Sequence, residues 1–523
     1  MLSEKTKIFI VIALIAVIGV FYVSTIRQGH GWGDDFAMYV HHAVNIVEKI
    51  PYSDTGYIYN SYELAISGPK AVPPIFPLML APIYKLFGLN FTAFKIEIIL
   101  CFLFALFFIY LVLRKELSFK YLIALLAVMG LSPFFWHIKD SVMSDFPFLF
   151  FAFLSLFLII RASNNNLLGK KQWLYGILIG FCSYLAYGAR VVGIVLPACL
   201  VCYELLKIKT AEGRPPKNLH AVWGGLPSAV FIALAVFALL AVGQALIVSS
   251  DTSYFNQFGS FGYQTVIKSF LISAKALIFF WGDYPQAVCL GFVVAFLALC
   301  GFVCRLKKKK ISVLEIFLIL FVLIIGLWPT NQGIRHLMPI IPLFLFYCFY
   351  FLQEIAEVRP RGALRGLTML IFPLILLGIS LTYFNYYTSD SFGPIKEGPF
   401  KKESQELFSY IKQNTQPDDV FIFNKPSAMA LFTLRDTSIH RETAIDQENW
   451  DYFNEISADY LVQRSGAIIK YHSNSLDGFV SRNQANLENV FSNADFVVFK
   501  IKEMSNLIKK PLLDKNQKTI IIE

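Results

Sequence analysis

Charged side chains are scarce in this sequence of 523 residues, and that scarcity excludes an ordinary soluble protein. Asp, Glu, Lys and Arg together make up 16% of the chain, whereas soluble domains carry about 25%. Hydrophobic residues make up 56%, and the chain contains 51 Phe. One soluble core cannot bury so much apolar surface, and the length exceeds what one core organises. The composition therefore predicts an integral membrane protein.

The sequence also lacks the short motifs that mark many soluble enzymes. It has no P-loop, no glycine-rich dinucleotide turn after a strand, no His-Glu-x-x-His and no Gly-x-Ser-x-Gly. Internal repeats and low-complexity tracts are absent as well. Every cysteine lies in or at the edge of an apolar run and none has metal-ligand spacing, so we expect buried thiols.

Eleven apolar runs are candidates for membrane-spanning helices, which need roughly 20 apolar residues each. The first run has no Ala-x-Ala site after it, which favours an uncleaved anchor over a signal peptide. The run 74–88 is also apolar, but its prolines and its lysine predict an interfacial or re-entrant helix. The predicted spans are 8–25, 93–113, 121–138, 146–161, 173–189, 191–206, 223–248, 286–304, 311–328, 337–353 and 366–384.

Lysine and arginine gather in one alternate set of the loops between these runs. The positive-inside rule assigns such loops to the cytoplasm, so eleven spans place the N-terminus inside and the tail outside. The basic excess therefore reflects membrane topology rather than nucleic-acid binding. The loops concerned contain Lys5/Lys7, Arg114/Lys115/Lys120, Arg161/Lys170/Lys171, Lys207/Lys209/Arg214/Lys217, Arg305/Lys307–Lys310 and Arg359/Arg361/Arg365.

The tail has the texture of a soluble domain. Residues 386–523 carry 16 Lys/Arg and 19 Asp/Glu, unlike the basic remainder. Short β-type runs predict strands at 420–423, 467–471, 496–501 and 519–522, and helical patterns cover 401–413 and 427–434. We therefore expect a membrane domain over 1–385, with 26–92 as its first extracytoplasmic loop, and a small extracytoplasmic α/β domain over 386–523.

Two adjacent carboxylates, Asp34 and Asp35, follow the first span and precede a predicted interfacial helix. Ionisable residues beside hydrocarbon are costly and are often functional. A partly buried carboxylate suits a general base, because burial raises its pKa towards neutrality. The alternative is that the pair caps the following helix, and the residues alone leave both open. Of His41 and His42, only one could join them as a metal ligand, and we favour no ligand role for either.

The second outer loop contains Lys139, Asp140 and Asp145. We expect Lys139 and Asp140 to be solvated loop residues, whereas Asp145 directly precedes an apolar run and is a functional candidate.

Arg335 and His336 lie on the predicted outer surface, where a cation opposes the general charge trend. Arg335 could bind a phosphate bidentately or extend towards lipid headgroups. Arg190, at another outer turn, presents the same two alternatives.

Several motifs recur in one order along the whole chain, and their order is more telling than any one of them. Asp35, Tyr39 and Ala43 form an Asp-x-x-x-Tyr-x-x-x-Ala pattern. A Pro-Pro helix that ends in Leu-Phe-Gly follows at 73–88, and then an Asp-x-Pro at Asp145. An Arg-x-Leu-x-Pro-x-x-Pro stretch begins at Arg335, and a strand and helix in the tail end near Arg435.

In these motifs the chain resembles the GT-C superfamily of membrane glycosyltransferases. The likeness is greatest to bacterial relatives of the protein O-mannosyltransferases and of the lipid A aminoarabinose transferase. Many members have a lysine directly before Pro-Pro, but Val72 stands there and the nearest lysine is Lys70. The resemblance implies a protein of the bacterial inner membrane.

The resemblance also implies an activity and roles for residues. A polyprenyl-phosphate sugar would be the donor and an envelope lipid, glycan or protein the acceptor, with a hexosyl or pentosyl group transferred at the extracytoplasmic face. Asp35 would be the base, with Asp34 beside it. The phosphate would be held by Arg335, helped by Arg190 or Lys139, and Asp145 would orient the sugar or a cationic partner. His336, Lys70 and Arg435 are further substrate-binding candidates. Some members bind a divalent metal near these acids, and the sequence leaves that question open.

Two other classes of function compete with a transferase. A transporter or lipid flippase would carry its ionisable residues near the bilayer midplane, often in matching halves. Here the notable acids cluster at the predicted outer edge and the halves do not match, which favours the transferase. A docking subunit of an envelope complex is the third class, and it should tolerate Asp35→Asn.

Overall fold

The computed structural model describes residues 2–63, 68–164, 170–211, 228–248, 263–328, 333–357, 363–389, 392–464 and 473–502. Contacts divide the chain into two compact units. The first unit comprises Met1–Gln28, His42–Ser53 and Ala71–Ile395, and the second comprises Gly29–His41, Asp54–Lys70 and Lys396–Glu523. The second unit therefore contains two segments of the first predicted outer loop in addition to the tail.

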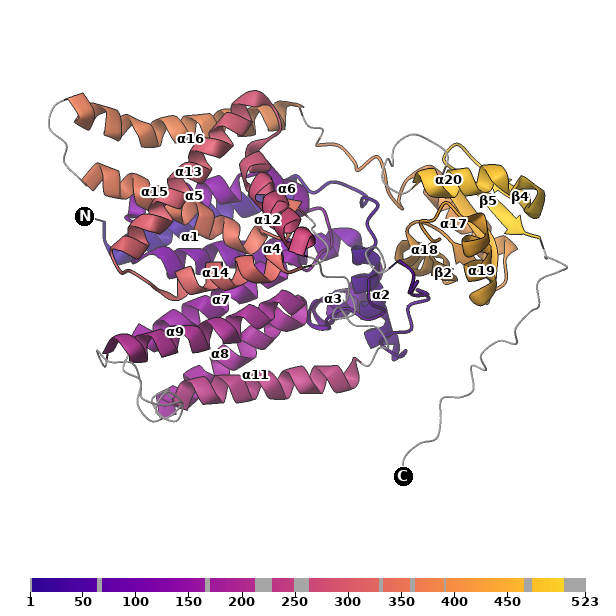
Figure 1. Ribbon diagram of the computed structural model, residues 1–523, viewed down its shortest axis with the longest axis horizontal. Coiled ribbons are helices and arrows are strands. Elements are labelled where there is room, and N and C mark those ends of the chain that lie inside the picture. Colours follow the sequence, from indigo (N-terminus) through magenta and orange to yellow (C-terminus); the bar gives the residue numbers. More distant parts are fainter. Residues whose placement is uncertain are drawn as a thin grey trace. The chain divides into compact units, whose positions relative to one another are not determined.

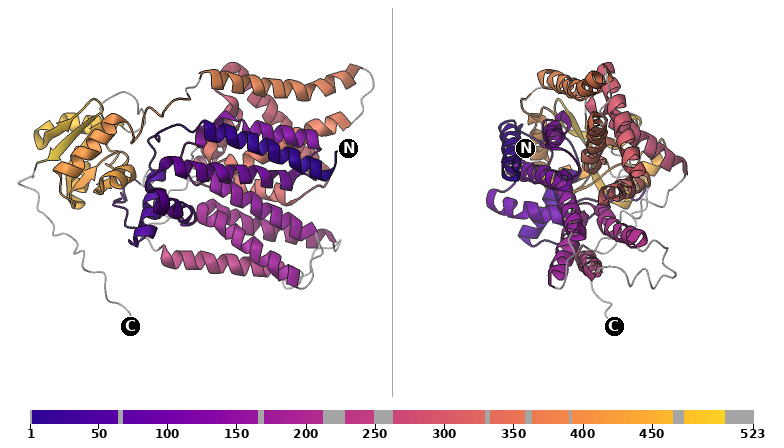
Figure 2. Two further views of the ribbon diagram at one scale, coloured as in Figure 1. Left: turned by 180° about the vertical axis from the view of Figure 1, so that it is seen from behind. Right: turned by 90° about the vertical axis from the view of Figure 1, so that its left-hand side faces the viewer.

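The first unit is a bundle of long apolar helices that run side by side (Figures 1 and 2). Several of them are hydrophobic around their whole circumference, as expected of helices surrounded by lipid and by other helices. The long helices are α1 (Glu4–Ser24), α4 (Phe91–Leu113), α7 (Asp145–Asn164), α8 (Lys170–Ala189), α9 (Val195–Ala211), α11 (Ser228–Ile247), α13 (Pro285–Lys307), α14 (Val313–Gly326), α15 (Ile341–Glu357) and α16 (Ala363–Ser389).

Shorter elements complete this unit. The apolar run at 74–88 forms α3 (Ile75–Phe87), whose 13 residues extend only about 20 Å at the rise of an α-helix. The remaining elements are α5 (Phe119–Gly130), α6 (Pro133–Ile138), α12 (Tyr263–Ile278), η1 (Val191–Ile194), η3 (Phe279–Trp281), η4 (Gly333–Arg335) and η5 (Met338–Ile340). Helix α2 (Asp35–Glu48) begins in a segment of the second unit and ends in one of the first.

Each of the eleven predicted spans coincides with a helix or a pair of helices, so the protein is a polytopic helical membrane protein. Seven helices of the described ranges are long and apolar enough to cross a membrane. The span predicted at 121–138 is interrupted, because Pro133 begins the new helix α6 three residues after α5 ends at Gly130. The number of spans stays a prediction.

Small residues allow neighbouring helices of the bundle to approach closely. A Cβ atom at Gly301 of α13 would lie 2.0 Å from the carbonyl oxygen of Tyr347 in α15, and one at Gly180 would lie 2.4 Å from that of Ala233. Such contacts bring backbones together where the hydrophobic effect gives no drive for helices to associate. Four of the eight cysteines are buried in this unit, but Cys289 is exposed, so the expectation of buried thiols is wrong for that residue.

The second unit is built on a five-stranded sheet with the order β2-β1-β3-β5-β4. Strands β1 (Val420–Ile422), β2 (Asp436–Ser438) and β3 (Ala458–Arg464) are parallel to one another. Strands β4 (Leu487–Ser492) and β5 (Phe496–Ile501) complete the sheet in antiparallel pairing. The strands predicted at 420–423 and 496–501 correspond to β1 and β5, whereas 467–471 and 519–522 lie outside the described residues.

Helices cover both faces of this sheet. Side chains from α17 (Lys402–Asn414) and α18 (Pro426–Thr433), the two helices predicted in the tail, share a core with Phe421. Side chains from α19 (Asp446–Glu455) and α20 (Ser473–Arg482) pack with Ile422 on the opposite face. The alternation of successive β1 residues between two apolar cores explains why this strand is hydrophobic throughout.

The segments of the first loop are integral to this second unit. Trp32 packs against one core, with its ring edge-on to Phe423 at 5.8 Å. Tyr57 forms a parallel β-bridge with Thr437 of β2, and the Asn60 side-chain amide donates to the Ile439 carbonyl at 3.0 Å. The sequence predicted a domain made of the tail alone. In the structure, residues some 380 positions earlier supply part of the core and extend one edge of the sheet.

The predicted orientation can be tested with engineered cysteines. We expect Ala444→Cys, on an exposed turn of the second unit, to react with a membrane-impermeant thiol reagent in intact cells. Lys307→Cys, at the exposed end of α13, should react only after the membrane is permeabilised. The parent protein reports the background from its own cysteines, and the opposite labelling pattern would reverse the topology.

Candidate functional site

Asp34 binds a helix of the second unit. Its Oδ2 accepts a hydrogen bond from the Ser427 hydroxyl at 2.9 Å, and its Oδ1 accepts one from the Ala428 backbone N–H at 3.2 Å. Both donors belong to the first turn of α18, where unpaired N–H groups favour an acidic partner. Burial raises the pKa of Asp34 above its ordinary value, while the nearby Lys425 and the two hydrogen bonds oppose that rise. The Asp34 side chain therefore caps α18, while its backbone carbonyl accepts from the Ala37 and Met38 N–H groups in the first turn of the helix that follows it.

Asp35 is the first residue of α2, and it is half-buried, as Asp34 is. Carboxylates in the first turn of a helix are stabilised by the helix dipole. The sequence analysis took Asp34 and Asp35 as a pair, whereas the structure gives the Asp34 side chain its own hydrogen-bond partners in α18.

The two histidines of α2 have different environments. His42 is buried in the first unit, where its Nδ1 lies 2.8 Å from the Tyr52 carbonyl and its Nε2 accepts from the Val72 N–H. Both ring nitrogens are therefore engaged in hydrogen bonds, as expected of a histidine without a ligand role. Burial lowers the pKa of His41 to about 4, although Asp54 opposes the shift. His41 is accordingly neutral at pH 7.

A second arrangement, in the first unit, has Asp145 at its centre. Asp145 is buried at the start of α7, Arg190 directly precedes η1, and Arg335 ends η4. Arg190 binds one carboxylate oxygen of Asp145 through Nη1, and Arg335 donates to the other through Nε at 2.9 Å. The sequence predicted a cationic partner or the donor sugar for Asp145, and the structure supplies two cationic partners.

Exposure and charge give this arrangement, which we call the Asp145 clamp (Asp145, Arg190 and Arg335), the properties of an anion site. The Asp145 side chain is 1% exposed, whereas each arginine side chain is 17% exposed. Two guanidinium groups share one carboxylate, which leaves an excess positive charge at a partly open position. Arginine forks match phosphate geometry. His336 directly follows Arg335 in the chain, so four of the predicted site residues come together here.

Lys139 and Asp140 are not solvated, so the sequence expectation for this pair is wrong. Both are buried, and Lys139 Nζ lies 2.6 Å from Asp140 Oδ2. Arg27 Nε lies 2.9 Å and Lys95 Nζ 3.7 Å from the same carboxylate. Lys139 also donates to the Thr25 carbonyl at 2.7 Å. We call this group the Asp140 cluster (Asp140, Arg27, Lys95 and Lys139). Because Lys139 donates to Asp140 and to the Thr25 carbonyl, its contacts favour a structural role over phosphate binding.

Sequence reasoning did not single out Arg27 or Lys95. Lys95 lies inside the predicted span 93–113, and a lysine within an apolar helix is itself a signal of a buried partner. That partner, Asp140, comes from a loop 45 positions later in the chain. Spacing along the sequence could not identify it.

Two remaining candidates lie in the second unit. Arg435 is 8% exposed, and its guanidinium donates to backbone carbonyls at the ends of α17 and α18, among them that of Thr415 at 3.0 Å. This geometry favours a role in capping helix ends. Lys70 is half-buried at the end of the segment Asp54–Lys70. Over the described ranges, no group of three or more His, Cys, Asp or Glu side chains is arranged to hold a metal ion.

Comparisons with known proteins identify the fold. No family model matches the chain, and no curated protein matches its sequence. The ArnT structure from Cupriavidus metallidurans, bound to undecaprenyl phosphate, is similar with 11% identity and a TM-score of 0.56, over 95% of this chain and 98% of that one.

Two further solved structures agree with this match. AglB, an oligosaccharyltransferase from Archaeoglobus fulgidus in complex with an inhibitory peptide and a dolichol-phosphate, has 13% identity and a TM-score of 0.58, over 88% of this chain and 70% of that one. The arabinofuranosyltransferase AftD from Mycobacteria has 10% identity and a TM-score of 0.51, over 96% of this chain and 42% of that one. The chain therefore has the fold of the GT-C superfamily.

The Asp140 cluster makes a stability prediction. Asp140→Asn would leave two buried lysines without their counter-charge, and breaking a buried pair in this way costs about 3–5 kcal/mol. We expect a clearly lower thermal unfolding temperature for the purified protein in detergent. Asp283→Asn, which removes an exposed carboxylate of the same unit, is the control and should change little. Adding Lys139→Gln to Asp140→Asn should recover part of the loss, and a further fall would contradict the charge explanation.

Proposed function

We propose that the protein is a glycosyltransferase that moves a sugar from a polyprenyl-phosphate donor to an acceptor of the cell envelope, at the extracytoplasmic face of the membrane. The observation that carries this proposal is the Asp145 clamp inside a bundle with the GT-C fold. Two solved structures of the same fold hold lipid phosphates, undecaprenyl phosphate in ArnT and a dolichol-phosphate in AglB. A lipid phosphate needs a cationic site that opens from an apolar bundle.

The clamp suits a phosphate that must leave during the reaction. When the sugar is transferred, the bond between its anomeric carbon and the phosphate oxygen breaks, and both electrons stay on the phosphate. Negative charge therefore grows on that oxygen in the transition state. Preorganised cations stabilise such charge most effectively when their positions are already held. The Asp145 carboxylate holds Arg190 and Arg335 close together and neutralises one of their two positive charges, so one net positive charge remains.

Asp35 is our candidate for the general base. As the new bond forms between the acceptor oxygen and the anomeric carbon, the acceptor hydroxyl loses a proton, which the Asp35 carboxylate would accept. Two observations support Asp35 over Asp34. Asp35 matches the acid of the superfamily motif, and both oxygens of Asp34 already accept hydrogen bonds from α18. A raised pKa would otherwise have made Asp34 the better base.

The clamp can be tested without knowing the sugar, because undecaprenyl phosphate itself is a suitable probe. We expect Arg335→Ala to weaken its binding to the purified protein by about 10- to 100-fold, the range for losing a hydrogen bond to a charged group. Arg335→Lys should recover only part, since lysine lacks the planar fork. Arg482→Ala, which removes an exposed arginine of the second unit, is the matched control. Unchanged binding in both Arg335 variants would remove Arg335 from the site.

The base is tested by transfer of labelled sugar from a panel of polyprenyl-phosphate donors. Asp35→Asn should bind undecaprenyl phosphate normally but transfer sugar about 10²–10⁴-fold more slowly, the usual contribution of a general base. Asp34→Ala should instead lower stability by about 1 kcal/mol, the usual cost of removing a helix-capping side chain. Ser427→Ala should add little to that loss, because it removes the same contact.

The opposite pattern would exchange the roles of the two acids. Full transfer by both single variants would mean that neither acid is the base. Binding of the lipid phosphate without transfer from any donor by the parent protein would instead favour a flippase.

A further inference from the structure

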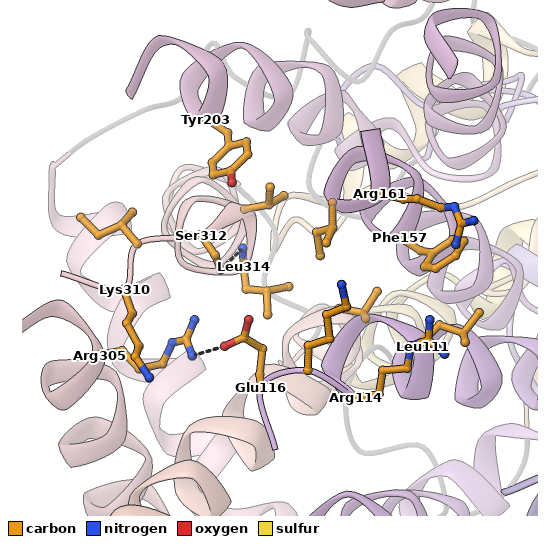
Figure 3. A pocket seen from close by; sticks show the side chains of 15 residues that line it. Leu111, Arg114, Glu116, Phe157, Arg161, Tyr203, Arg305, Lys310, Ser312 and Leu314 are labelled. Carbon is orange, nitrogen blue, oxygen red and sulfur yellow. Dashed lines mark hydrogen bonds and ion pairs between the residues drawn. The ribbon is translucent and has the colours of Figure 1, made fainter. Parts of the chain in front are cut away.

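A second cationic site lies in the first unit, at the ends of the helices where the lysine- and arginine-rich loops begin. It is a cavity of about 600 Å³, shown in Figure 3. Its lining comes from the C-terminal ends of α4, α7 and α13, from α9, and from the start of α14. Five cationic side chains and a single carboxylate face it: Arg114, Lys115, Arg161, Arg305, Lys310 and Glu116.

The floor of this cavity is a satisfied ion-pair network. Arg305 is 1% exposed and lies 2.6 Å from Glu315 and 2.7 Å from Glu116. Glu315 also accepts from the Ser312 backbone N–H at 2.7 Å and from the Tyr347 hydroxyl at 3.1 Å. The charge of Arg305 is thus balanced within the protein. Glu116 is the single carboxylate among the residues that line the cavity, so the other four cations give the cavity a positive electrostatic potential.

The position of these cations relative to the spans identifies the kind of ligand. Three of the candidate spans are Phe91–Leu113, Asp145–Ser163 and Pro285–Lys307. Arg114 and Lys115 follow the first directly, and Arg161 lies at the end of the second. The cavity is also lined by apolar residues from inside the spans, among them Leu111, Phe157 and Ile160. Cations at the limit of the hydrocarbon, beside an apolar wall, suit a molecule with a phosphate head and an acyl body.

We propose that this cavity binds the phosphate headgroup of an anionic phospholipid. The ligand comes from the bilayer, and its headgroup lies among Arg114, Lys115, Arg161 and Lys310 while its acyl chains continue along the apolar wall. Arg161 is already oriented by a hydrogen bond from its Nε to the Tyr175 hydroxyl at 2.8 Å. Because its lining residues are not those of the Asp145 clamp, this site is independent of the proposed transferase chemistry.

The test uses the full chain in detergent and native mass spectrometry with phosphatidylglycerol and, separately, phosphatidylcholine. We expect phosphatidylglycerol to bind better and to raise the unfolding temperature, as any ligand of the native state does. Replacing Arg114 and Lys310 together by Gln should weaken phosphatidylglycerol binding about 25-fold, since each basic residue near an anionic lipid contributes about fivefold. Lys307→Gln removes an exposed cation that does not line the cavity and should leave binding unchanged.

Competition separates the two sources of phosphate and the two cationic sites. Millimolar inorganic phosphate should not displace phosphatidylglycerol. If phosphate instead binds with the same dependence on Arg114 and Lys310 while the lipid does not bind, the ligand is soluble and the proposal is wrong. Arg335→Ala should not affect phosphatidylglycerol binding. Equal binding of the two phospholipids, or no loss in the double variant, would likewise overturn the proposal.

Discussion

A charge inside an apolar helix bundle must be balanced by an opposite charge brought to it by another part of the chain, and the membrane unit of this protein depends on that constraint. Asp140 is the shared counter-charge of three cations, which are Lys95 from α4, Lys139 from its own loop and Arg27 just after the end of α1. An unpaired buried charge would cost more than these helices gain by packing. The cluster therefore links the segment after α1 to α4 and to the loop that contains Asp140.

Two other carboxylates of this unit are also paired with arginines, with different consequences. Glu315 balances Arg305 in a site where both side chains are at most 1% exposed. Asp145 balances Arg190 and Arg335, but these arginines remain 17% exposed. The Arg305–Glu315 pair is scaffolding, because both of its charges are buried and already paired. The partial exposure of its arginines is what makes the Asp145 clamp the better candidate for binding a phosphate.

The second unit shows how one loop can serve two purposes. Trp32 packs against the core of the sheet, and Asp34 caps α18, while Asp35 begins α2 one residue later. A residue that carries chemistry is most useful when its neighbours are held rigidly. The contacts of Asp34 and Trp32 supply that rigidity to the segment containing Asp35, which is consistent with the role proposed for it.

The sequence by itself determined the class of protein, the location of its helices and the identity of most candidate residues. Apolar runs and proline breaks are local properties, so each predicted span coincides with a helix or a pair of helices, and the order of the motifs indicates the GT-C fold. Tertiary structure alone decided which charges meet. The sequence predicted that Lys139 and Asp140 are solvated loop residues, because the partners Lys95 and Arg27 are 45 and 113 positions away from Asp140. Asp34 and Asp35 could not be told apart by burial or pairing in the sequence, because α18, which binds Asp34, lies nearly 400 positions later. Burial and pairing are relations between distant segments, and no local pattern records them.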